Sequence, residues 1–294
     1  MDTTEITNIV EKIRNPATRW DGLVELKNIK EITDEETLIE YCDDQLWIIR
    51  WVIIEKIGDL GISSCTEKCF EKLSDTDAHV VRNAEKALFK FFSRSIDLAI
   101  HQLDNSGERM RSCCEAYIKE NLLNHIEAIE KAILTCNIVI ANKLMLLVFQ
   151  NEDIDSEDLF LRATQVETVR KHAIMMLALK QSTRAIPYFI HLYETGSLKR
   201  HIVESIKQMD PTIAFPILID YLPLKESKEN VKEIIIKVDK PIVPFLIDRI
   251  SDERLRESII DILKKGSLTL PIYTILEKKV EENPALEAHI RLEE

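Results

Sequence analysis

Two cysteines of this sequence have a spacing at which both side chains could bind one soft metal ion. Cys65 and Cys69 are four residues apart on a predicted helix, which places their thiols on one helical face. A structural zinc ion needs further ligands, usually at the tighter CxxC spacing, and the sequence contains no CxxC pair. We therefore interpret both residues as small apolar core residues and predict no metal site.

The other cysteines also lack a ligand or disulfide pattern, and no histidine lies near them in the sequence to activate a thiolate. They are Cys42, Cys113, Cys114 and Cys136. The segment Met1–Glu5 has neither the basic nor the apolar part of a secretory leader. In a chain of 294 residues we expect all six thiols to be reduced.

Motifs of common enzymes are missing from the sequence. It contains no glycine-rich phosphate loop of the GxxxxGK[ST] or GxGxxG type, no GxSxG and no HExxH. The histidines are scattered over different segments, at His79, His101, His125, His172, His191, His201 and His289. The sequence therefore favours a noncatalytic protein without a cofactor over an enzyme, and we name no catalytic residue.

Three tryptophans near the N-terminus are candidate binding residues. Trp20 and Trp51 each directly follow an arginine at the start of a predicted helix, and Trp47 lies one turn before Trp51. The same place in other helices is polar, at Ser112, Lys171 and Glu257. A place that is polar elsewhere faces solvent, so we predict that the tryptophans form a partner-binding patch. The alternative is an end cap whose tryptophans cover the first core.

The elements that carry these residues are repeated. A small or apolar pair, a proline and an apolar run recur around Pro187, Pro216, Pro244 and Pro271, at steps of 29, 28 and 27 residues. Such a period indicates one structural unit used many times. We expect each proline at the third or fourth position of a helix, where a missing amide costs no intrahelical hydrogen bond.

An arginine followed by a helical pattern extends the repeat toward the N-terminus. After Arg50, for example, apolar residues stand three, four and seven positions on. The marker arginines are Arg19, Arg50, Arg82, Arg111, Arg170, Arg200 and Arg256, about thirty or sixty residues apart. Polar groups that suit turns and helix N-caps precede several of them, at Asp43–Asp44, Asp75–Asp77, Asp104–Ser106 and Ser251–Asp252.

These markers divide the chain into pairs of helices. The predicted pairs are 4–14 with 17–29, 34–42 with 45–58, 64–74 with 77–92, 94–103 with 108–121, 122–135 with 137–149, 156–164 with 166–180, 184–194 with 197–208, 212–222 with 227–237, 241–250 with 253–264, and 269–281 with 284–292. No Gly/Ser- or Pro-rich linker interrupts them. We predict one domain over 1–294, with the acidic stretch 150–158 as the place for a flexible break.

Composition and charge restrict the partners. The chain is 45% hydrophobic and 31% charged, as in globular proteins, and its net charge is −12. An acidic protein repels phosphate backbones, so nucleic acid is not expected as a partner. The longest apolar stretch, 138–149, contains Lys143 and is too short to cross a bilayer. We expect a cytoplasmic protein that does not bind membranes.

The paired pattern resembles the HEAT repeat, and most of all its short variety, first noted in phycobilisome lyases. The matching segments are Trp47–Arg50, His79–Ala84, Val169–Ala173 and the four proline segments, within about 15–282. The resemblance implies an all-α, right-handed superhelical solenoid of about nine to ten helix pairs. In the family, the turn Asp and the helix Arg pair between neighbouring units, which implies a scaffold role for Arg50, Arg82, Arg111, Arg170 and Arg256.

For function, the resemblance implies a protein-interaction scaffold or adaptor that binds another protein on a concave face lined by the second helices. HEAT-like enzymes that bind iron use His-Glu dipeptides, and this sequence has none. One alternative is a DNA-binding or alkylpurine-glycosylase-like enzyme, which the charge of −12 disfavours. Another is a lyase-like helper for a prosthetic group, which would need a reactive thiol or a tight pocket. The residues predicted to bind the partner are Trp20, Trp47 and Trp51.

Overall fold

The computed structural model describes residues 3–32, 34–105, 107–196, 198–238 and 242–265, together with 277, 278, 280, 281, 284 and 287. Over these residues the chain is all-α, with helices as its regular elements and no strand. The prediction of an all-helical protein is thereby confirmed. The proline segment Thr269–Thr274 lies outside the described residues, as does most of the final predicted pair.

The helices form two compact units, Met1–Val148 and Phe149–Glu294, which we call the N-terminal and C-terminal units. The boundary falls within α10 (Ile138–Gln150), directly before the acidic stretch in which the sequence places a flexible break. A single domain over 1–294 stays a prediction.

The N-terminal unit begins with α1 (Thr3–Arg14), α2 (Arg19–Asn28), α3 (Glu35–Tyr41), α4 (Trp47–Leu60), α5 (Thr66–Lys72) and α6 (Ala78–Arg94). It continues with α7 (Ile96–His101), α8 (Glu108–Glu120), α9 (Ile126–Thr135) and α10, and includes the short 3₁₀ helices Ser63–Cys65 and Leu123–His125. The C-terminal unit contains α11 (Glu157–Ala163), α12 (Arg170–Leu179), α13 (Ala185–Glu194), α14 (Lys199–Gln208), α15 (Pro211–Asp220), α16 (Lys228–Val238), α17 (Val243–Asp248) and α18 (Glu253–Lys265).

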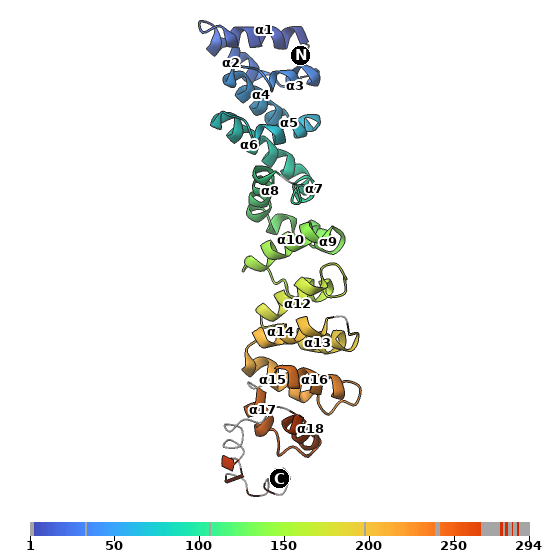
Figure 1. Cartoon of the computed structure of the whole chain (residues 1–294). Helices are drawn as coiled ribbons and strands as arrows, with labels where there is room; N and C mark the ends of the chain where they lie inside the picture. The colour runs from blue at the N-terminus through green and yellow to red at the C-terminus, as the bar shows by residue number, and fades with distance from the viewer. Residues whose placement is uncertain are drawn as a thin grey trace. The chain divides into compact units, whose positions relative to one another are not determined.

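Within each unit the helices contact one another in two ways (Figure 1). A first helix contacts the second helix that follows it, as α1 contacts α2, α5 contacts α6 and α11 contacts α12. The second helices of successive pairs also contact one another. In the N-terminal unit α4 packs on α6, and in the C-terminal unit α12, α14, α16 and α18 contact one another in turn. Each pair thus buries its apolar stripe against the next pair.

Asp and Asn side chains fix the turn between the two helices of a pair in the N-terminal unit. Each accepts a hydrogen bond from the backbone N–H two residues further on, which holds the chain in a tight turn. The N···O distances are 2.8–3.0 Å, and the acceptors are Asp44, Asp75, Asn105 and Asn137. Asp77 also caps α6 by accepting from His79 N–H at 2.8 Å. The predicted turn and N-cap residues Asp44, Asp75, Asp77 and Asn105 are confirmed, and Asn137 is a turn residue that was not predicted.

The marker arginines close the same turns from the other side. Five of them donate to the carbonyl oxygen six residues earlier, near the end of the preceding helix, where carbonyls lack an intrahelical donor. The bonds run from Arg19 to Ile13, Arg50 to Asp44, Arg111 to Asn105, Arg170 to Thr164 and Arg256 to Ile250, at 2.6–3.3 Å. Arg82 is exposed, and its turn, counted from Asp75, is one residue longer than the turn from Asp44 to Arg50.

Arg50 also contacts the neighbouring helix pair. Its Nε and Nη2 atoms donate to the two oxygens of Asp75 at 2.9 and 2.7 Å. The two side chains are 12% and 5% exposed. Burial by itself raises the pKa of Asp75, but the hydrogen bonds and positive charge of Arg50 outweigh it, so the pKa of Asp75 is lowered. The Asp–Arg pairing implied by the family resemblance is present here.

A glycine allows α4 and α6 to pack closely. A Cβ atom at Gly58 would lie 2.7 Å from Cβ and 2.8 Å from Cα of Ala87. Both positions are buried and lie among core residues such as Ile57 and Leu88. Because backbone atoms of α6 occupy the space in which a side chain would stand, this contact requires glycine.

Of the three prolines in the described proline segments, two lie in the first turn of a helix. Pro187 is the third residue of α13, as expected, and Pro244 is the second residue of α17, one position earlier than expected but still in the first turn. Pro216 instead lies inside α15, so the expected first-turn position is wrong there. α15 begins at Pro211, one residue before the predicted start, so Pro216 is its sixth residue; Asp210 caps the helix through Thr212 N–H at 2.8 Å.

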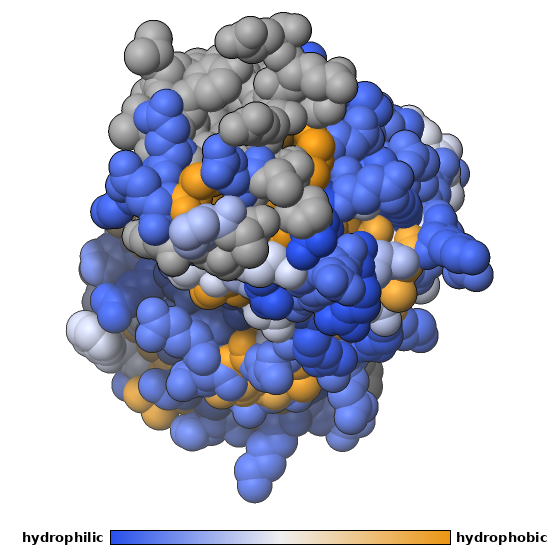
Figure 2. All heavy atoms as spheres, turned by 90° about the horizontal axis from the view of Figure 1, so that it is seen from below, coloured by the Kyte–Doolittle hydropathy of each residue, from blue (hydrophilic) through white to orange (hydrophobic). Residues whose placement is uncertain are grey.

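No helix within the described ranges is long and apolar enough to cross a membrane. In the view of Figure 2 the coloured residues are mainly hydrophilic, and hydrophobic ones form small, separate patches. That face therefore carries no broad apolar surface among the residues shown in colour.

Candidate partner-binding surface

The predicted tryptophans lie on second helices of the N-terminal unit. Trp20 is the second residue of α2, Trp47 is the first residue of α4, and Trp51 follows one turn later. Trp20 is 76% and Trp47 40% exposed, whereas Trp51 is half-buried. An end cap would bury such rings, so the exposure of Trp20 favours the binding interpretation over the cap.

Aromatic rings come together around Trp47. Its ring centroid lies 6.5 Å from that of Trp51, with the planes tilted by 52°. On its other side the ring stacks on His79, at 5.5 Å and 27°. Among the described residues, Trp20 has no ring contact with this group; it lies on α2, which contacts α4. The structure thus joins two of the three predicted residues directly and adds a histidine.

Sequence reasoning missed His79, although the repeat contains the signal for it. Trp47 lies three residues before Arg50, and His79 lies three residues before Arg82. The two residues therefore occupy the same position of successive repeats, and stacked repeats bring equivalent positions side by side. Comparing that position across the repeat would have placed His79 beside Trp47.

The backbone below the aromatic rings is held in place. Asn83, which is 4% exposed, donates from Nδ2 to the carbonyl oxygen of Trp51 at 3.2 Å. The close packing at Gly58 fixes α4 on α6 a few turns further on. Trp20 shares the outer face of α2 with Val24, one turn later and 57% exposed. The rings are therefore presented by fixed helices, which lowers the entropic cost of binding.

A hollow lies between α6 and α8, and some of its lining residues occupy the same repeat positions as the tryptophans. Its volume is about 530 Å³, and its lining includes Glu85, Phe89, Glu108 and Ser112. Glu108 and Ser112 stand three residues before and one after Arg111, the positions that Trp47 and Trp51 occupy relative to Arg50. We call the side formed by Trp20, Trp47, Trp51, His79 and this hollow the aromatic surface.

Most of the cysteines are buried in the core. Cys42, Cys65 and Cys69 are fully buried, and burial raises the pKa of each thiol, to about 12 for Cys69. Free thiols are present at all six positions. Within the described ranges no three His, Cys, Asp or Glu side chains are arranged to hold a metal ion. Cys65 and Cys69 are buried residues, as interpreted from the sequence.

Thiol labelling is expected to separate one cysteine from the others. Burial raises the pKa of all six thiols, so they are mostly protonated at pH 8, but Cys136 is partly exposed while the other five are buried. A thiol reagent at pH 8 should modify Cys136 first in the folded protein and all six in denaturant, as mass spectrometry of the digested protein would show. Equally fast labelling of Cys69 would contradict this burial.

Comparisons with known proteins leave the family open. The sequence matches no protein-family model and no curated protein. Solved structures with some similarity include human deoxyhypusine hydroxylase in complex with glycerol, at 12% identity, TM-score 0.31, and coverage of 90% of this chain and 96% of that one. An engineered protein aligns at 10% identity, TM-score 0.32, and 99% and 97% coverage. YibA of E. coli aligns at 18% identity, TM-score 0.29, and 81% and 92% coverage. TM-scores this low establish no shared fold and support no functional inference.

Proposed function

We propose that the protein is a noncatalytic scaffold or adaptor that binds another protein through its aromatic surface. The observation that carries the proposal is the exposed Trp20 and Trp47, the latter stacked on His79, along second helices of the N-terminal unit. Tryptophan is enriched among residues that dominate binding energy, and rigid presentation adds to its effect. The acidic chain favours a partner with a basic surface, and we place the activity in the cytoplasm.

We further propose that the helix pairs are HEAT-like and form a right-handed solenoid of about nine to ten pairs. Support comes from the contacts between successive second helices and from the recurring turn carboxylates and marker arginines. A stack of this kind has an extended face suited to a protein partner.

Two features disfavour the alternatives. A DNA-binding enzyme would need free basic groups along the second helices, but the guanidinium groups of Arg50, Arg170 and Arg256 bind carbonyls of their own turns. A helper that attaches a prosthetic group through a thiol would need an accessible thiolate, whereas five cysteines are buried and burial raises the pKa of all six, including that of the partly exposed Cys136.

Truncating Trp20 and Trp47 to alanine is expected to weaken partner binding by at least about 30-fold, which is the effect of losing about 2 kcal/mol from one interface tryptophan alone. The tagged protein would be purified from its native cell with its bound proteins, and the affinity of the main partner measured with purified components. Leu123→Ala is the control, since Leu123 is 54% exposed and is not among the residues that form the aromatic surface.

Both variants should keep the far-ultraviolet circular dichroism of the unchanged protein, because the substituted side chains lie at the surface and outside the buried core. If the double variant retained every bound protein with unchanged affinity, the aromatic surface would not be the binding site.

A further inference from the structure

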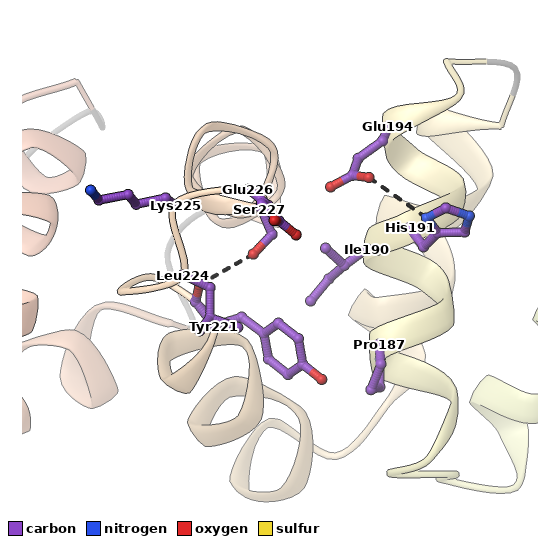
Figure 3. Close-up of a pocket in the computed structure, with 9 residues that line it drawn as sticks. All are labelled: Pro187, Ile190, His191, Glu194, Tyr221, Leu224, Lys225, Glu226 and Ser227. Carbon is purple, nitrogen blue, oxygen red and sulfur yellow. Dashed lines mark hydrogen bonds and ion pairs between the residues drawn. The ribbon is translucent and has the colours of Figure 1, made fainter.

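The C-terminal unit contains a second hollow, of about 520 Å³, between α13 and the turn that joins α15 to α16 (Figure 3). One wall comes from residues at helical spacing on α13 and the other from the turn. The residues that shape it are Pro187, Ile190, Glu194, Tyr221, Leu224 and Glu226.

The turn is held by internal hydrogen bonds. Leu224 N–H donates to the carbonyl oxygen of Tyr221 at 3.2 Å, and Lys228 N–H donates to that of Leu224 at 2.9 Å. The Ser227 hydroxyl is nearly buried and donates to the same Tyr221 oxygen at 3.4 Å. Leu222 is fully buried and anchors the start of the turn. The wall opposite α13 is therefore formed before any ligand arrives.

The side walls of the hollow are negatively charged, and its floor is apolar. In Figure 3 the carboxylates of Glu194 and Glu226 face the hollow from opposite walls, and the ring of Tyr221 extends below them toward Pro187. The Lys225 side chain points away, so its charge does not cancel theirs.

The two carboxylates differ in how far they are already paired. Glu194 lies 3.6 Å from Nδ1 of His191, whose ring points away from the hollow. The Glu226 side chain is exposed, and among the described residues no donor pairs with it. At least one carboxylate at the hollow is thus available to an incoming cation.

We propose that this hollow binds the side chain of an arginine from a partner protein. A guanidinium group is flat, so it can stack on the Tyr221 ring while its N–H groups donate to Glu194 and Glu226. The methylene stem of the arginine would lie against Ile190 and Leu224. The net charge of −12 adds a general attraction for basic segments.

The inference does not depend on the aromatic surface. It rests on residues 187–227 of the C-terminal unit, whereas the tryptophans lie in the N-terminal unit. A failure of one proposal therefore leaves the other standing.

The test is a titration of the full chain with the blocked tripeptide acetyl-Gly-Arg-Gly-amide, followed by NMR of the Leu224 and Ile190 methyl groups. We expect saturable shifts with a Kd of about 1 mM. The corresponding lysine peptide should bind more weakly, because an ammonium group cannot stack flat on a ring or donate two parallel hydrogen bonds to a carboxylate. The citrulline peptide, which has the same shape without charge, should not bind.

Variants distinguish the hollow from general attraction. Glu226→Gln, Glu194→Gln and Tyr221→Leu should each weaken binding about threefold. Glu204→Gln, an exposed change on α14 outside the hollow, should leave the affinity unchanged. The proposal is overturned if the citrulline peptide binds equally well, if Glu204→Gln weakens binding as much as Glu226→Gln does, or if no saturable shift occurs up to about 20 mM peptide.

Discussion

Replacing Gly58 by valine is expected to lower the unfolding free energy of the N-terminal unit by about 3 kcal/mol, at the upper end of the usual cost of overpacking. The first added carbon would lie 2.7 Å from Cβ and 2.8 Å from Cα of Ala87. Backbone atoms cannot rotate away as the end of a side chain can. α4 and α6 would have to separate, which would open the contact below Trp51.

Urea unfolding followed by tryptophan fluorescence measures this effect. The protein has three tryptophans, all in the N-terminal unit, so their emission reports that unit. Gly58→Ala tests whether the change lowers or raises the unfolding free energy. Alanine has the higher helix propensity by about 1 kcal/mol, yet it should destabilise because its Cβ already meets Ala87. Gly107→Ala, at the N-cap of α8 and outside the α4–α6 contact, is the comparison, because its Cβ would approach a side-chain atom, Asn105 Oδ1, to 3.3 Å rather than backbone atoms. A stabilised Gly58→Ala variant would show that α4 and α6 are further apart than described.

Removing one partner of the Arg50–Asp75 pair is expected to cost about 3 kcal/mol, at the lower end for a nearly buried pair, because Asp75 would keep only Lys72, whose Nζ lies 3.7 Å from its Oδ2. Arg50→Met would leave the Asp75 carboxylate with 5% exposure and would also remove the bond to the Asp44 carbonyl. Asp75→Asn would leave the guanidinium. The double variant should be more stable than the sum of the single changes implies, since neither charge then remains unpaired.

The pair also predicts how stability depends on pH. The pKa of Asp75 is lowered from 3.8 in the folded protein, so the stabilisation is fully present above pH 3.8 and is lost as the pH falls through the folded value. The urea concentration at the unfolding midpoint should therefore decrease more steeply for the unchanged protein than for Asp75→Asn when the pH is lowered from 7 to 3. Parallel curves would mean that the pair contributes nothing to the pH dependence.

The helices themselves were largely predictable from the sequence. The apolar period after Arg50 and the polar residues before it place a helix at 45–58, and α4 spans Trp47–Leu60. Helix starts are local, since they depend on nearby side chains such as Asp77, which caps α6. Pro216 lies beyond the expected first turn because α15 begins at Pro211, which makes Pro216 its sixth residue.

The candidate sites were predictable only in part. The tryptophans stand out as large residues at positions that are otherwise polar. The stacking of His79 on Trp47 requires the register of two repeats to be compared, and a histidine there has no motif of its own. The hollow of Glu194 and Glu226 combines residues 32 positions apart, from a helix and a turn whose geometry depends on the packing of α13 with α15 and α16.

The central claim, that the aromatic surface binds a partner protein, is tested most directly by ¹⁹F NMR of the protein labelled with 5-fluorotryptophan. The spectrum should contain three resonances, from Trp20, Trp47 and Trp51. Adding the unlabelled partner obtained from the native cell should shift or broaden the resonances of Trp20 and Trp47, which single Trp→Phe variants would assign. If the partner bound with all three resonances unchanged, the tryptophans would lie outside the interface and the account of this surface would be wrong.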